Sequence, residues 1–136
     1  MALFALIERI LTARSPVLEL NTERPASQIA AALELEGYRA VVVDRAPVFD
    51  KETLLHALYQ GCGFPAYFGF NWDALADTLK DTEGHDARPL ILLFRDFDLL
   101  RKRAPEVAEL FLDIVREVGD TPAAAGTLKR LVLLQR

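Results

Sequence analysis

The chain has 136 residues, of which 51% are hydrophobic and 26% charged, and its formal net charge is -4. These values predict one folded domain with a sizeable core and exclude a disordered chain. The single cysteine, Cys62, excludes an internal disulfide, which fits a reducing compartment and predicts a cytoplasmic protein. The apolar runs are too short to span a bilayer, so no membrane association is expected.

The first 36 residues are expected to form a mainly helical extension. Residues 2–13 carry an apolar stripe at helical spacing, and they lack the basic start of a signal peptide. The stripe needs a surface to cover it, which is either the chain's own sheet or helices or a second copy, in a homodimer. Residues 16–21 are compatible with a short strand, and residues 27–36 predict a helix that ends at Gly37.

Residues 37–136 are expected to form the main domain, which is α/β. The expected strands are 39–44, 89–94 and 128–134. The expected helices are 50–59, 72–79 and 105–118. Asp50 and Asn71 are the expected N-caps of the first two helices, and Pro105 is expected in the first turn of the third. Gly61 and Gly63 are expected to end the first helix. The basic run Arg101–Arg103 is expected in a solvated loop. Nearly continuous apolar strands separated by helices favour a parallel sheet that is covered on both faces.

The segment Phe64–Leu79, FPAYFGFNWDALADTL, concentrates the features that suggest a binding site. A loop rich in aromatic residues leads to Asn71, and the helix that follows carries Asp73 and Asp77. Because these two acids are four positions apart, they share one face of the helix. Leu75 and Leu79 point to another face and are expected to reach the core.

Negative charge is concentrated in and after the same segment. Residues 64–87 hold one base, Lys80, and five acids, so their sum equals the net charge of the whole chain, -4. The acids are Asp73, Asp77, Asp81, Glu83 and Asp86. A patch of this kind repels nucleic acid and attracts a basic partner. A solvated helix end followed by an acidic loop is the other interpretation.

The same segment resembles the barstar family of intracellular inhibitors of bacterial ribonucleases. The matching positions follow the family pattern Pro-x-Tyr-aromatic-Gly-x-Asn-apolar-Asp-Ala-Leu-x-Asp-x-Leu, and they are Pro65, Tyr67, Gly69, Asn71, Asp73, Ala74, Leu75, Asp77 and Leu79. A weaker resemblance extends over residues 38–135. It implies a barstar-like fold, a three-stranded parallel sheet with packed helices, to which residues 1–36 are appended.

The resemblance also implies a function, that of an inhibitor or immunity protein. Such a protein is not an enzyme, needs no cofactor or metal, and blocks the active cleft of a basic ribonuclease. The residues implied to bind the nuclease lie on the loop, the acidic helix and a later helix; they are Tyr67, Gly69, Asn71, Asp73, Ala76, Asp77 and Glu117. Asp77 matches the central acid of the family.

Some positions depart from the family pattern. Ala76 stands where the founding inhibitor has a tryptophan, and Phe70 replaces a polar loop residue. Trp72, the chain's only tryptophan, lies one helical turn earlier and is either a core residue or a partial substitute for the missing aromatic surface. Because these changes fall in the binding segment, the partner is expected to differ from that of the founding member.

Two other functions remain open from the sequence. The same fold and patch would suit a binding module for a basic protein that is not a nuclease. Asp73 and Asp77 could also serve as the general acid and base of a hydrolase, which would require a cleft and unequal environments for the two carboxyl groups. Neither His56, His85 nor Cys62 has the spacing of a metal site.

Overall fold

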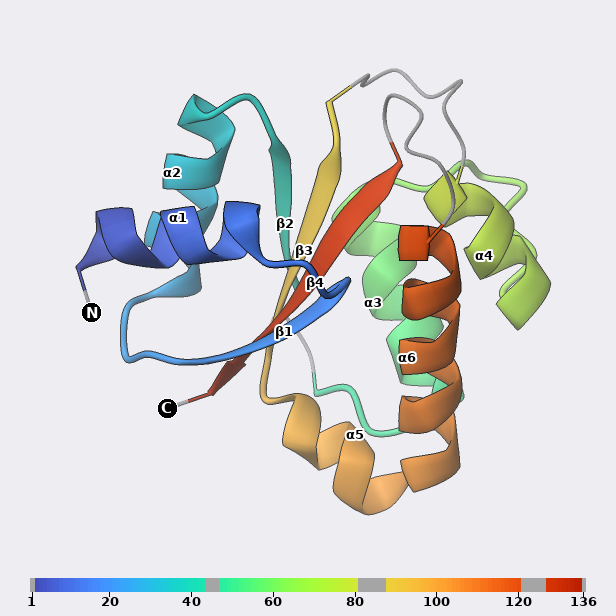
Figure 1. The fold of residues 1–136 in the computed structure, drawn as a ribbon. Helices are drawn as coiled ribbons and strands as arrows, with labels where there is room; N and C mark the ends of the chain where they lie inside the picture. The colour runs from blue at the N-terminus through green and yellow to red at the C-terminus, as the bar shows by residue number, and fades with distance from the viewer. Residues whose placement is uncertain (1, 44–46, 81–87, 121–126, 136) are drawn as a thin grey trace.

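A computed structural model describes residues 2–43, 47–80, 88–120 and 127–135 (Figure 1). Its centre is one parallel sheet with the strand order β1-β4-β3-β2. The strands are β1 (Val17–Asn21), β2 (Arg39–Val43), β3 (Leu90–Arg95) and β4 (Leu128–Gln135). The expectation of an α/β fold with a parallel sheet is therefore confirmed.

The expected number of strands in the sheet was wrong, because β1 adds a fourth to the three predicted. It pairs with β4 in the register Val17 to Leu131 through Asn21 to Gln135. The resemblance to the family extends only from residue 38, so it could not show that a strand from the first 36 residues enters the same sheet. The boundary drawn near residue 36 stays a prediction.

Helices cover both faces of the sheet. They are α1 (Leu3–Thr12), α2 (Ala26–Leu35), α3 (Lys51–Cys62), α4 (Trp72–Lys80), α5 (Phe97–Arg103) and α6 (Pro105–Asp120). Figure 1 shows α1 and α2 on one side of the sheet, and α3, α4 and α6 on the other. The side chains of β3 alternate between the two core layers: Ile91 and Leu93 face α1 and α2, and Leu92 and Phe94 face the other helices.

The apolar stripe of α1 packs against the chain's own sheet. Leu6 and Ile10 are fully buried in the core layer that includes Leu93 and Val132. The buried guanidinium of Arg130 also donates hydrogen bonds to three carbonyls of residues 10–15, at 2.5–3.0 Å. A homodimer through this segment stays a prediction, and it would have to use outward residues such as Phe4, which is 77% exposed.

Two helix boundaries differ from those expected. The helix α3 continues past Gly61 to Cys62, and Gly63, at φ 64°, provides its left-handed C-cap. Arg101–Arg103 forms the last turn of α5 rather than a loop. The reason is that Phe97 and Leu100, three residues apart, bury one face of α5, while Arg101 donates to Glu19 of β1 at 2.9 Å.

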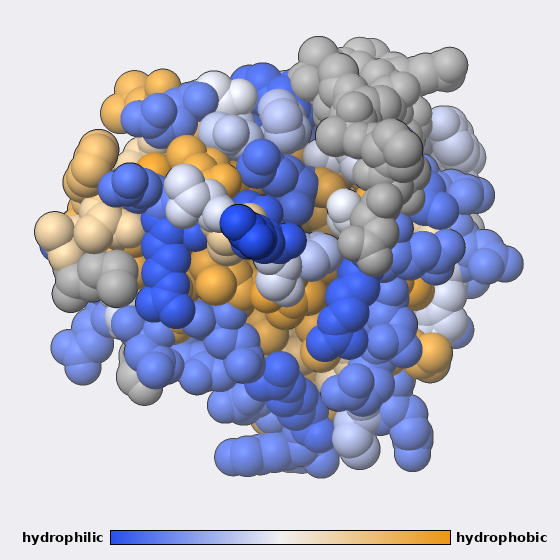
Figure 2. All heavy atoms as spheres, in the orientation of Figure 1, coloured by the Kyte–Doolittle hydropathy of each residue, from blue (hydrophilic) through white to orange (hydrophobic). Residues whose placement is uncertain are grey.

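The surface is mixed in polarity. Figure 2 shows hydrophilic residues over most of the viewed face, with hydrophobic residues visible between them near its centre. Within the described ranges, no helix combines the length and apolar character needed to cross a membrane.

Candidate functional site

The helix α4 starts at a side-chain cap, as the sequence predicted. The Asn71 Oδ1 accepts a hydrogen bond from the Ala74 N–H at 2.7 Å, and its Nδ2 donates to the Gly69 carbonyl at 3.3 Å. A Cβ added at Gly69 would come within 3.1 Å of the same amide nitrogen. Glycine at 69 and asparagine at 71 therefore fix together how the loop enters the helix.

The two acids of α4 are both exposed, and the leucines between and after them are buried. Leu75 is 0% exposed and Leu79 is 1% exposed, which confirms that they reach the core. Asp73 and Asp77 consequently face solvent from one side of α4. Across the part of the chain that the structure describes, neither carboxylate makes an ion pair. Ala76 lies beside them and is partly buried.

The loop before α4 sends successive aromatic residues in opposite directions. Tyr67 is 85% exposed, whereas Phe68 is 6% exposed and belongs to the core. A turn closed by the Phe68 N–H and the Pro65 carbonyl, at 2.9 Å, sets this alternation. Tyr67 is therefore an aromatic side chain held out to solvent on an anchored loop.

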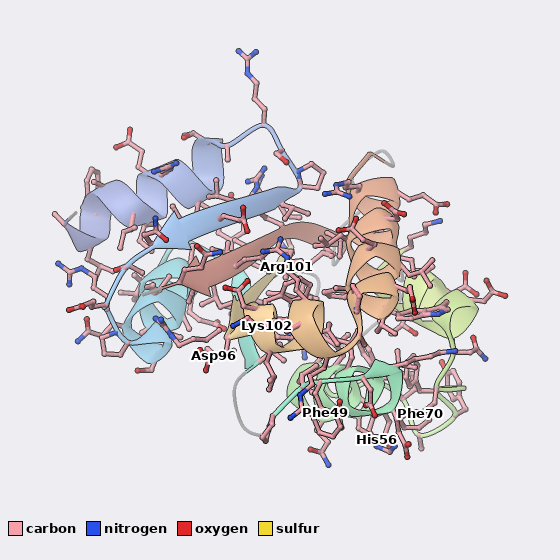
Figure 3. The ribbon with its side chains drawn as sticks, turned by 90° about the horizontal axis from the view of Figure 1, so that it is seen from below. Phe49, His56, Phe70, Asp96, Arg101 and Lys102 are labelled. Carbon is pink, nitrogen blue, oxygen red and sulfur yellow. The ribbon has the colours of Figure 1, made fainter. Side chains whose placement is uncertain are left out.

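Phe70 packs the loop against α3 through contacts between aromatic rings. Its ring centroid lies 4.5 Å from that of His56 and 4.9 Å from that of Phe68. Its backbone has a φ of 50°, which is uncommon for a residue with a side chain. Figure 3 shows His56 and Phe70 on the same edge of the molecule as Phe49, which is 41% exposed.

Trp72 contacts the core and also reaches the surface. It is partly buried against the core, and the Lys51 ammonium lies 5.3 Å from the centroid of its ring. Lys51, His56 and Phe70 also line a cavity of about 380 Å³ beside the loop. Neither Lys51 nor His56 could be assigned to this site from the sequence, because both belong to α3 and meet the loop only in the folded chain.

The acid predicted on the later helix lies near α4. Glu117 is on α6, which packs against α4, and its Oε1 is 3.7 Å from the Nζ of Lys80. The fold thus brings Glu117 to the base at the end of the acidic helix. Asp81, Glu83 and Asp86, the other acids of the predicted patch, lie outside the described residues.

Two reactive side chains, Cys62 and His56, lie in the described part of the chain, and neither is placed as a nucleophile or base would be. Burial raises the pKa of the Cys62 thiol to about 12, which makes it a poor nucleophile near neutral pH. His56 is exposed and packs against Phe70. Among the residues described here, no three histidine, cysteine or acidic side chains gather in a way that could hold a metal ion.

Comparison with known proteins gives one family and one fold. The family model described as Barstar (barnase inhibitor) matches residues 38–133. No curated protein sequence matches the chain. Among solved structures, that titled "Structure of the Aeropyrum Pernix ORC2 protein (ADPNP-ADP complexes)" superimposes with a TM-score of 0.66 at 16% identity. The superposition covers 98% of this chain but 39% of that one, so it shows a shared fold alone.

Proposed function

Because the chain belongs to the barstar family, we propose that it inhibits a basic ribonuclease by binding across the active cleft of the nuclease. The observation that carries this proposal is the exposed pair Asp73 and Asp77 on α4, next to the exposed Tyr67. A ribonuclease must present cationic groups to the phosphates of its substrate. Two carboxylates one helical turn apart can occupy the positions that those phosphates would take.

The helix α4, which carries the two acids, is firmly held in the fold, and this supports the proposal. The Asn71 side chain caps α4, and Leu75 and Leu79 fasten the helix to the core. The two carboxylates are therefore held in place before the partner arrives. Less conformational entropy is lost on binding when the contacting groups are already ordered.

The surroundings of the acids complete the proposed contact surface. We define this surface by the seven residues Tyr67, Gly69, Asn71, Asp73, Ala76, Asp77 and Glu117. Tyr67 offers a large aromatic contact on the loop, of the kind that contributes strongly at interfaces. Glu117, next to Lys80, adds a third carboxylate from α6.

The departures from the family pattern bear on which nuclease is bound. Ala76 leaves the centre of the surface without a large side chain, while Phe70 and the Lys51–Trp72 pair add aromatic and basic groups beside it. We infer that the cognate nuclease fills the space over Ala76 with a larger side chain of its own.

A basic protein other than a nuclease is the second candidate, and the same departures favour it. They change the contact surface while leaving the acids and the fold in place. A hydrolase has less support, because both carboxyl groups are exposed and so share one kind of environment, whereas an acid–base pair needs different ones. In either binding role we expect the protein to act in the cytoplasm.

A capture experiment separates these candidates. The immobilised protein is exposed to proteins from its source cells, in parallel with an Asp73→Ala/Asp77→Ala double variant. Proteins retained by the wild type but not by the variant are then assayed for ribonuclease activity. Recovery of a ribonuclease supports the inhibitor, and recovery of only non-nuclease basic proteins supports the second candidate.

A further inference from the structure

Arg95, the last residue of β3, has a buried guanidinium whose hydrogen-bonding capacity is not filled. The residue is 7% exposed, and among the described residues its Nη1 has no hydrogen-bond partner. A buried donor without an acceptor costs free energy, and a charged donor costs more than a neutral one. Arg95 is not among the site residues predicted from the sequence, and it does not belong to the proposed contact surface.

The guanidinium points to the start of α2. The Arg95 Nη2 donates to the carbonyl of Arg24 at 2.7 Å, and Arg24 directly precedes Pro25, the N-cap residue. Pro25 offers no capping side chain, and the first turn of α2 has no acidic residue. The N–H groups of Ala26 and Ser27 have no acceptor within the helix, because the first amides of any helix lack one. In the described part of the chain, the Arg95 Nη1 and the N–H groups at the start of α2 are therefore donors without an acceptor that lie close together.

These donors line a cavity of about 590 Å³, together with Gln60 and Glu23. The lining also includes Ala40, Val41 and Val42, so the cavity runs along the edge strand β2, between the end of α3 and the start of α2. Arg95 reaches it from the carboxyl end of the neighbouring strand β3. Figure 3, seen from below, labels Asp96, the residue after Arg95, between α2 and α5.

We propose that this cavity binds the phosphate group of a small molecule. A helix N-terminus supplies N–H donors and a positive partial charge, and a guanidinium supplies charge-assisted hydrogen bonds, both of which suit phosphate. The bound oxygens would give the Arg95 Nη1 the acceptor that it lacks. Since the site uses β3 and α2 and not α4, it is independent of the proposed nuclease contact.

Among the described residues that line the cavity, Glu23 is the one acid, and it is exposed. Its carboxylate opposes a bound anion, so Glu23→Gln should tighten phosphate binding.

Isothermal titration of the full-length protein at constant ionic strength tests the proposal, with inorganic phosphate and a nucleoside monophosphate as the probes and chloride as the blank. Saturable binding of either probe is expected. Tighter binding of free phosphate identifies an inorganic anion, and tighter binding of the monophosphate identifies a phosphate ester. Arg95→Gln should weaken binding by about tenfold or more, while Arg103→Gln, which removes an exposed arginine of α5, should leave it unchanged.

A second variant keeps the test decisive if Arg95→Gln does not fold. Ser27→Asp places a carboxylate in the first turn of α2, where it can satisfy the same donors. It should abolish phosphate binding and raise the melting temperature. Absence of saturable binding to the wild type, or binding to Ser27→Asp equal to that of the wild type, would overturn the proposal.

Discussion

The ammonium of Lys80 lies 3.7 Å from the carboxylate of Glu117, so the base that ends α4 is paired with the acid that α6 adds to the proposed contact surface. Both side chains are substantially exposed, and such pairs contribute less than about 1 kcal/mol to stability. In the proposed contact, a cation from the partner has to compete with Lys80 for Glu117.

Replacing Lys80 should therefore speed association with a basic partner. Lys80→Gln removes a charge that repels a basic partner and ends the competition of Lys80 for Glu117, and we expect the association rate to rise by up to about fivefold at low salt. Glu117→Gln should lower the rate. Stopped-flow fluorescence measures both. Equal rates for the two variants would mean that α6 is outside the contact.

Asp77→Ala should weaken partner binding more than any other single change on α4. Truncating a charge that is buried against a cation at an interface costs about 2–5 kcal/mol. The fold should be unaffected, because Asp77 is exposed in the free protein. Glu8→Ala is the matched control, since Glu8 is an exposed helical acid on α1. Affinities from titration calorimetry that fall equally for the two variants would show that only net charge is recognised.

Asn71→Ala should destabilise the protein by about 1 kcal/mol, because the first turn of α4 loses its capping acceptor. Asn71→Ser keeps a capping oxygen and should retain most of that stability. Chemical denaturation compares the two variants with the wild type. If the serine variant is as unstable as the alanine variant, the capping bond is not what stabilises this turn.

The core under α1 should matter for stability and not for binding. Leu6→Ala removes a fully buried side chain and should cost about 2–5 kcal/mol of unfolding free energy, whereas Phe4→Ala, on the exposed side of the same helix, should cost less than about 0.5 kcal/mol. Partner affinity, measured below the unfolding transition, should match the wild type for both variants. Loss of binding in folded Leu6→Ala would place residues 1–36 in the binding site.

Most helices and the central strands could be predicted from local sequence. The capping residues Asp50 and Asn71 marked two helix starts, and the apolar residues of β3 and β4 marked buried strands. These features depend on neighbouring residues, so a single sequence contains the information.

The features that the sequence did not reveal depend on distant partners. β1 pairs with the final strand of the chain, and nothing near Val17 indicates that pairing. The helix α5 was missed because its basic last turn suggested a loop, although Arg101 is paired there with Glu19. The contact of His56 with Phe70 and the unfilled guanidinium of Arg95 also arise only when separate elements meet.

The measurement that tests the central claim most directly is a stoichiometric titration of the captured ribonuclease. Increasing amounts of the purified protein are added to a fixed amount of nuclease, and cleavage of an RNA substrate is followed at low and high salt. We predict that activity falls to zero at one equivalent, and that the association rate drops as salt rises, since steering charges are screened beyond about 10 Å at 0.1 M. A nuclease that remains fully active in the presence of excess protein would contradict the account.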